Sequence, residues 1–87
     1  MAEPRLEEIG RVARFFARPS VAVLALTAPL RVGERIFIKG HTTDAQELVR
    51  SMQVAHQAVE QAAPGTEVGV QVGARCRPHD VVYRLTA

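Results

Sequence analysis

The sequence predicts an all-β fold in a single small domain, and two observations carry this prediction. Apolar residues recur in short runs that alternate with polar residues, which is the pattern of strands with one buried face. Glycine and proline separate these runs at short intervals, as turns between strands do. A chain of 87 residues buries only about 60% of the surface that it exposes when unfolded, so nearly every apolar run is needed for one core.

Three strands are expected in the first half of the chain, over residues 9–16, 21–26 and 35–39. Pro19 separates the first strand from the second, because proline cannot donate to a sheet ladder and is common in turns. A tight turn at Gly33 leads into the third strand, where isoleucine alternates with other residues. The basic residues of the first and third segments would form one stripe if these strands are neighbours in the sheet.

Two further strands are expected near the C-terminus, over residues 67–72 and 80–85. The first of them has valine at every second position, so its valines share one face. Pro64 and Gly65 precede it and fit a type II turn, in which glycine accepts the positive φ of the third position. Gly69 lies inside the strand and suggests a bulge or a tight bend.

The segment over residues 44–62 has two interpretations. Thr43 and Gln46 stand at capping-box spacing, and apolar residues then recur at helical intervals until Pro64, which together indicate an amphipathic helix. The alternative is a strand around residues 48–54, with side chains alternating between two faces. Periodicity slightly favours the helix, and the residue pattern alone leaves both open.

Three segments follow one another in a recognisable order, at residues 30–40 (LRVGERIFIKG), 51–54 (SMQV) and 62–70 (AAPGTEVGV). This order resembles domain II of the translation GTPases, the family of elongation factor Tu. Gly33, Gly65 and Gly69 fall on the glycines of that family. The resemblance is closer to a group of small stand-alone elongation factor-like proteins. In that group a string such as IKGHTTD precedes SMQ, and these strings stand here at residues 38–44 and 51–53. The resemblance covers residues 9–85.

The resemblance implies a small closed antiparallel six-stranded β-barrel of the translation-factor domain II type. The domain would span residues 1–87, with a barrel core over roughly 8–86. It also places a strand around residues 48–54 and a loop with at most one helical turn at 58–63. Closure of the barrel would remove exposed sheet edges in a chain too short to cover them otherwise.

The function that the resemblance implies is a non-enzymatic binding module that contacts tRNA or ribosome-associated RNA. The residues expected to contact RNA are Arg11, Arg14, Arg35, Lys39 and His41. The alternative is a protein partner, or an accessory barrel without RNA contact, and the expected partner-binding loop consists of His41, Thr42, Thr43 and Asp44. Both surfaces also have a structural explanation, as a solvated basic face and as a hydrogen-bonded turn. Phe15, Phe16 and Phe37 are expected in the core rather than as base-stacking platforms.

Catalysis, metals and cofactors are not expected. The three histidines, His41, His56 and His79, lack the spacing of a compact metal site, and Cys76 has no base beside it in the sequence. There is no phosphate-binding loop, so nucleotide hydrolysis is excluded. A single cysteine, the lack of an apolar run of about 20 residues and an acidic start without a signal-peptide pattern lead us to expect a cytoplasmic protein without membrane contact. The net charge of +2 is too small to argue for nucleic acid by itself.

Overall fold

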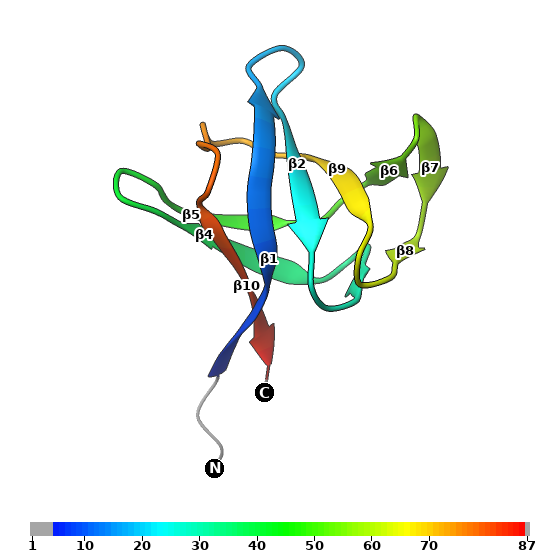
Figure 1. Cartoon of the computed structure of the whole chain (residues 1–87), viewed down its shortest axis with the longest axis horizontal. Helices are drawn as coiled ribbons and strands as arrows, with labels where there is room; N and C mark the ends of the chain where they lie inside the picture. Colours follow the sequence, from blue (N-terminus) through cyan, green and yellow to red (C-terminus); the bar gives the residue numbers. More distant parts are fainter. Residues whose placement is uncertain (1–4, 87) are drawn as a thin grey trace.

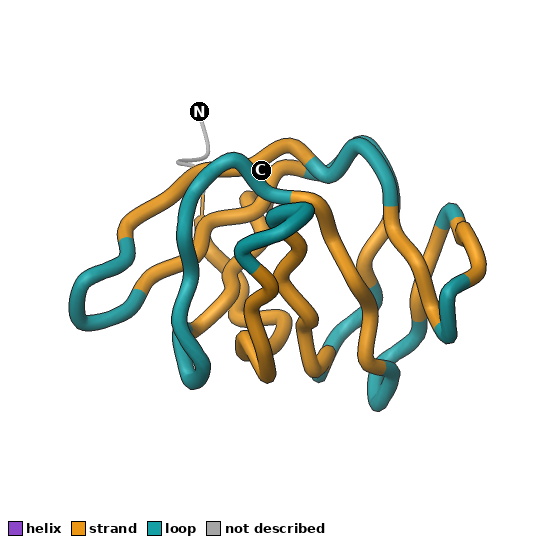
Figure 2. The backbone as a smooth tube through the Cα atoms, turned by 90° about the horizontal axis from the view of Figure 1, so that it is seen from above, coloured by secondary structure: helices purple, strands orange, loops and turns teal. Residues whose placement is uncertain are grey.

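The computed structural model describes residues 5–86, and these residues form strands, turns and loops without a helix (Figures 1 and 2). The all-β class is therefore confirmed. Residues 1–4 and 87, which the expected limits of the domain include, lie outside the described part. The strands are β1 Arg5–Phe16, β2 Val21–Leu26, β3 Leu30–Arg31, β4 Arg35–Lys39, β5 Asp44–Leu48, β6 Met52–Val54, β7 Gln57–Val59, β8 Gln61–Ala62, β9 Glu67–Gln71 and β10 Val81–Thr86.

Eight of the strands form one open antiparallel sheet, in the order β5-β4-β10-β1-β2-β9-β6-β7, and β3 pairs with β8 separately. The sheet curls so that β4 and β5 pass behind β1 and β2 in Figure 1, but its end strands β5 and β7 do not pair with each other. The prediction of a closed six-stranded barrel is therefore wrong. After β5 the backbone of Val49 bonds to Glu34 and Gly33, at 2.9 and 2.8 Å, which directs the chain to the turn before β4 instead of closing the sheet.

The core lies on the inner face of the curled sheet and is almost entirely aliphatic. Alternation along the strands places the buried residues: Ala22, Leu24 and Leu26 on β2 face inward, and so do Val68 and Val70 on β9. Burying one of these leucine or valine side chains contributes about 1.5–3 kcal/mol. Among the described residues, the buried apolar set is Ile9, Val12, Ala22, Leu24, Leu26, Leu30, Ile36, Ile38, Val49, Met52, Ala62, Val68, Val70, Val72, Cys76 and Val82.

The long strand β1 carries two irregularities that let it pair with both β10 and β2. Its register shifts between Glu8 and Gly10 on the β10 side and between Val12 and Arg14 on the β2 side. Gly10 is buried at the first of these shifts, where a Cβ atom would overlap the carbonyl oxygen of Ala25. The bulges increase the local twist of β1, which allows one strand to serve both halves of the curled sheet.

The segment over residues 44–62 forms four short strands, so the helical interpretation is wrong. The expected strand at 48–54 is interrupted by residues 49–51, and the expected loop at 58–63 contains parts of β7 and β8. Met52 pairs with Val70 on one side and Val59 on the other, and it is 1% exposed. Pairing with distant strands therefore prevails over the local helical periodicity.

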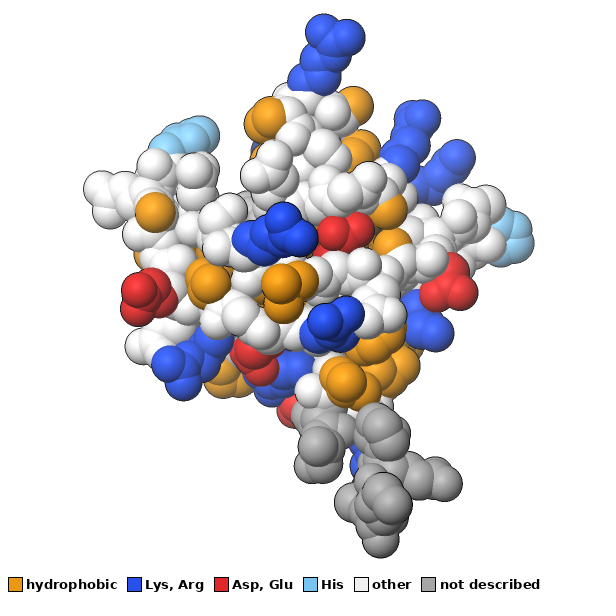
Figure 3. All heavy atoms as spheres, turned by 180° about the vertical axis from the view of Figure 1, so that it is seen from behind, with side chains coloured by type: hydrophobic (Ala, Val, Ile, Leu, Met, Phe, Trp, Pro, Cys, Tyr) orange, Lys and Arg blue, Asp and Glu red, His pale blue; other side chains and the backbone are white. Residues whose placement is uncertain are grey.

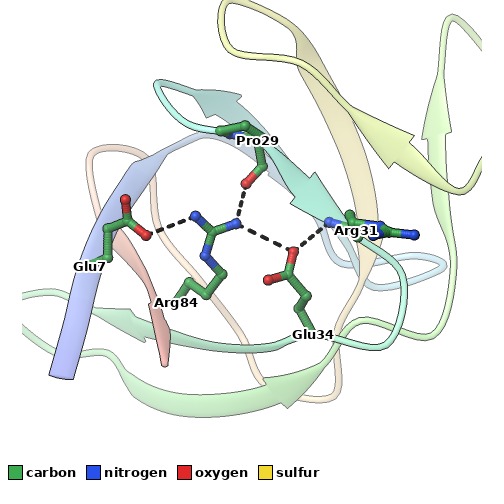
Figure 4. A network of polar contacts seen from close by, with 5 residues as sticks. All are labelled: Glu7, Pro29, Arg31, Glu34 and Arg84. Atoms are coloured by element: carbon green, nitrogen blue, oxygen red, sulfur yellow. Dashed lines mark hydrogen bonds and ion pairs between the residues drawn. The ribbon is translucent and has the colours of Figure 1, made fainter. Parts of the chain in front are cut away.

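A network of charged side chains lies at the end of the sheet where β1 begins and β10 ends (Figure 4). Arg84 donates hydrogen bonds to Glu7 at 2.7 Å, to the carbonyl oxygen of Pro29 and to Glu34 at 3.4 Å. Glu34 also accepts a 2.7 Å bond from the backbone N–H of Arg31. The hydrogen bond to Glu7, followed by the charges of Glu34 and Glu7, raises the pKa of Arg84. The guanidinium therefore ties β10 to β1 and to the β3–β4 turn.

No helix within residues 5–86 has both the length and the apolar character to span a membrane.

Candidate functional site

A pocket of about 590 Å³ lies on the outer face of β1, β2, β9 and β6. Its floor consists of Val21, Val23 and Gly69. In the sheet, Gly69 pairs with Val23 on one side and with Gln53 on the other, so the floor spans β2 and β9, and Gln53 on β6 borders it. The outer face of these strands thus carries an apolar hollow, on the side of the sheet opposite the core.

The hollow depends on the absence of a side chain at Gly69. A Cβ atom built there would lie 3.4 Å from the Val21 Cγ1 atom, which is an ordinary contact. The backbone at Gly69 continues the regular ladder on both sides, without the expected bulge or bend. By contrast, Gly33 and Gly65 have φ values of 96° and 85° and stand in open turns. Glycine at position 69 therefore leaves space above the sheet rather than supplying an unusual backbone conformation.

The rim of the pocket is cationic and carries an exposed aromatic ring. Arg14 and Phe16 come from the end of β1, Arg18 from the β1–β2 turn and His56 from the β6–β7 turn, while Glu67 on β9 is the one acidic residue lining it. Phe16 is 48% exposed and Phe37 alternates with the buried Ile36 and Ile38, so both correct the expectation of a place in the core. Such a hollow, with apolar floor and cationic rim, suits a ligand that combines an apolar group with negative charge.

The β6–β7 turn is held in an unfavourable backbone conformation beside the pocket. Ala55 and His56 form its two-residue loop, and their φ values are 51° and 64°. Hairpin loops with two positive φ values usually contain Asn and Gly, because other side chains cost roughly 1–2 kcal/mol per residue there. Both residues line the pocket. Backbone strain of this kind is concentrated at functional sites, which supports this face of the sheet as the site.

A second hollow, of about 720 Å³, lies on the other side of the end of β1, and Arg14 and Phe16 line it too. Its remaining lining residues are Phe15, Arg75, Cys76, Arg77 and Pro78. Burial, with the nearby charges of Asp80 and Glu47, raises the pKa of the Cys76 thiol to about 11. The thiol is therefore protonated at neutral pH and is a poor nucleophile.

Asp80 organises the loop that holds Cys76. This buried carboxylate accepts a 2.9 Å hydrogen bond from the backbone N–H of Arg77, and it lies so close to Gly40 that a Cβ atom there would overlap it. The carbonyl oxygen of Asp80 also accepts a 2.8 Å hydrogen bond from the backbone N–H of Val12. The loop is thus fastened to β1 and to the end of β4, and these contacts explain Asp80 without a catalytic role.

The basic residues expected to contact RNA do not form one continuous stripe. Arg11 and Arg14 lie on β1, whereas Arg35 and Lys39 lie on β4, and β10 separates the two strands. Of this set and His41, only Arg14 lines the pocket. A continuous stripe would require the two segments to be neighbours in the sheet, and the strand order does not provide that.

The loop with His41, Thr42, Thr43 and Asp44 connects β4 to β5. Thr43 is 6% exposed, and its carbonyl oxygen accepts a 2.7 Å bond from the N–H of Gly40. Asp44 lies 3.9 Å from Lys39 in an exposed ion pair. The other side chains of the loop point to solvent. Thr43 therefore supports the turn, while His41, Thr42 and Asp44 are presented outward.

Within residues 5–86, no three His, Cys, Asp or Glu side chains gather in a way that could hold a metal ion.

Comparisons with known proteins relate the chain to peptidases. It is 44% identical over 79 residues to an uncharacterized protease of Methanocaldococcus jannaschii, covering 90% of this chain and 19% of that protein. It is 31% identical over 79 residues to a collagenase of Porphyromonas gingivalis, covering 88% of this chain and 22% of the collagenase. The chain thus spans about a fifth of the length of these curated relatives. No protein-family model matches it.

Among solved structures, the fold matches the C-terminal domain of a presumed U32 peptidase from Geobacillus thermoleovorans. The TM-score is 0.84 at 15% sequence identity, and the match covers 90% of this chain and 91% of that domain. A selenomethionine variant of the same domain matches with a TM-score of 0.83.

These findings overturn the resemblance to translation factors, together with the RNA-binding translation function that it implied. The alternative of a free-standing interaction module or accessory barrel gains no support from them either. The misleading signal was the order of turn glycines and short strands, which many small β-domains share because tight turns demand the same residues. The chain has the fold of a U32 peptidase C-terminal domain and is similar in sequence to about one fifth of a protease and of a collagenase.

Proposed function

We propose that the chain is a noncatalytic domain of the kind found at the C-terminus of U32-type peptidases, and that its outer pocket binds polypeptide for such an enzyme. Its relatives are named for activity on proteins, which makes polypeptide the natural ligand class. The observation that carries the proposal is the pocket with the apolar floor of Val21, Val23 and Gly69 and the cationic rim of Arg14 and Arg18.

The chemistry of the pocket favours a particular kind of polypeptide segment. The floor accepts an apolar side chain, and burying it contributes about 25 cal/mol per Å². The two guanidinium groups at the rim can each bind a carboxylate with two parallel hydrogen bonds. A segment with an apolar residue next to Asp, Glu or the terminal carboxylate satisfies both features. Peptide hydrolysis would be the task of another part of such an enzyme, because Cys76 is protonated and buried.

The test is a titration of the ¹⁵N-labelled chain with an octapeptide that has a central leucine flanked by glutamates. The matched peptide carries lysine in place of each glutamate. We expect shifts at the pocket residues with the acidic peptide and at least tenfold weaker binding of the basic one. Arg14→Glu should weaken the acidic peptide at least tenfold, since a charge-assisted hydrogen bond contributes about 1.5–3 kcal/mol. Arg50→Glu changes the net charge equally, but Arg50 does not line the pocket, so this control should bind within twofold of the parent.

Gly69→Val provides a second test that leaves the charges unchanged. The Cβ atom fits beside Val21, and the atoms beyond it would occupy the pocket, so the fold should persist while binding is lost. A folded Gly69→Val variant that binds the acidic peptide as the parent does would refute the pocket as the binding site.

A further inference from the structure

A second outward surface lies at the opposite end of β1 from the pocket and is apolar. Leu6 on β1 pairs directly with Leu85 on β10, and two residues earlier on β10 Tyr83 pairs with Phe37 on β4. Extending that register by one pair places Leu85 beside Arg35, whose partner on β5 is Leu48. We call Leu6, Phe37, Leu48, Tyr83 and Leu85 the leucine face.

The leucine face concentrates the apolar exposure of the described residues. Their exposed large hydrophobic side chains are Leu6, Phe16, Val32, Leu48 and Leu85, and three of these five belong to this face. Leu6, Leu48 and Leu85 are 41–42% exposed, while Phe37 and Tyr83 are half-buried between them. Figure 3 shows the side of the molecule that faces away in Figure 1, where hydrophobic side chains gather toward the lower end of the view beside Lys or Arg side chains. Leu6, Leu85, Tyr83 and Phe37 lie next to one another on neighbouring strands, while Arg35 separates Leu48 from Leu85. Exposed apolar side chains gathered in this way, with a charged residue among them, mark an interface.

The position of the face indicates what covers it. In the relatives, about four-fifths of the protein lies outside the matched segment, and in the solved homologue this fold is the C-terminal domain. In a protein built like that homologue, a preceding domain would be connected to the start of β1, where Leu6 lies. Its linker would hold it beside the leucine face, at a high effective concentration for docking.

We propose that the leucine face packs against the preceding domain of a U32-type peptidase. This inference rests on the assignment of the chain as a domain of such an enzyme. Leu6 and Phe16 stand ten residues apart on one strand, roughly 33 Å at the rise of an extended chain. Docking at the beginning of β1 therefore leaves the pocket at its end open to polypeptide.

The experiment uses a full-length chimera. This chain replaces its 79-residue counterpart in the Methanocaldococcus jannaschii protease, with and without Leu6→Ser and Leu85→Ser together. We expect the chimera to unfold in one thermal transition and to resist trypsin at the domain junction. The double variant should show two transitions and cleavage at least tenfold faster. Val32→Ser is the matched control, because Val32 is similarly exposed at 38% but lies outside the leucine face, and it should behave as the parent.

The same substitutions in the isolated chain separate this inference from the proposed function. The double variant should keep its melting temperature within about 3 °C, since both leucines are already exposed, and should bind the acidic peptide as before. A chimera whose junction is equally resistant with and without the two leucines would overturn the inference while leaving peptide binding intact. Sedimentation of the isolated chain as a dimer that the double variant dissociates would also overturn it, because a second copy would then be the occupant. Docking without peptide binding would uphold the leucine face and refute the pocket.

Discussion

Replacement of Arg84 by methionine should destabilise the domain by about 2 kcal/mol. The Arg84 side chain is 16% exposed and joins three segments through Glu7, Pro29 and Glu34. Methionine retains most of the aliphatic stem, so the substitution chiefly removes the guanidinium and its hydrogen bonds rather than the packing. This network is suited to a quantitative test because each partner has a known exposure.

The magnitude follows from the three contacts. Glu7 is 48% exposed and its pair with Arg84 is screened by water, so the pair contributes at most about 1 kcal/mol. The bond to the carbonyl of Pro29 contributes about 1 kcal/mol. Glu34 lies 3.4 Å from the Arg84 guanidinium and keeps its hydrogen bond from the Arg31 N–H in the variant. Loss of the Arg84–Glu34 contact therefore adds only a few tenths of a kcal/mol. For a domain of this size, a loss of about 2 kcal/mol lowers the melting temperature by roughly 8–16 °C.

Thermal unfolding followed by circular dichroism and urea denaturation at neutral pH measure the effect. Arg50→Met is the control, because it removes the same charge from an exposed position and should change the free energy of unfolding by less than about 0.5 kcal/mol. Glu7→Gln should lie between the two, at under 1 kcal/mol. If Arg84→Met and Arg50→Met melt within about 3 °C of each other, the guanidinium does not hold the three segments together.

Three further outcomes are expected, and they concern the buried positions Gly10 and Cys76. Gly10→Ala should lower the free energy of unfolding by about 3 kcal/mol or more, measured by urea denaturation, because the new Cβ would overlap the Ala25 carbonyl. Gly65→Ala should lower it by only about 1 kcal/mol, because the Cβ there meets open space and only the φ of 85° is unfavourable. Similar losses for both would show that β1 adjusts to a side chain. Cys76 should react slowly with a disulfide reagent at pH 8, because its pKa of about 11 keeps it protonated. The unfolded chain releases the thiol proton from about pH 9, whereas the folded chain holds it until about pH 11. The free energy of unfolding should therefore fall between pH 9 and 11, by at most about 1.4 kcal/mol per pH unit. The fall should be less steep in Cys76→Ala, which lacks the thiol.

The strands with strict alternation were the predictable part of the fold. The valines of β9 and the isoleucines of β4 show their buried face directly in the sequence, because a period of two has no competing interpretation there. Residues 44–62 were harder, since Met52 and Val59 fit both a helical face and two sides of a hairpin. After β5 the backbone hydrogen bonds of Val49 to Gly33 and Glu34 direct the chain away from closing the sheet. The pattern of side chains in the sequence gives no indication of these backbone bonds.

The candidate site was only partly accessible from the sequence. Arg14 was singled out, but its neighbours Phe16, Arg18 and His56 come together through the pairing of β1, β2, β9 and β6, which spans more than forty residues of sequence. The sequence does not show that Phe16 faces outward, because the bulge between Val12 and Arg14 shifts the alternation of the two phenylalanines that follow it. The position of Gly69 within a regular strand was a usable signal, because glycine there needs a reason other than a turn.

The pairing of the first described strand with the last also sets the mechanical behaviour of the domain. Arg5 pairs with Thr86, so the two ends of the described chain lie side by side on adjacent antiparallel strands (Figure 1). Tension applied between these ends loads the hydrogen bonds of β1 and β10 one pair at a time, as in unzipping, instead of shearing all of them together. The outermost pairs, beyond the first bulge of β1, would open first. A domain attached in this way yields to a weak pull at its ends long before the centre of its core is disturbed.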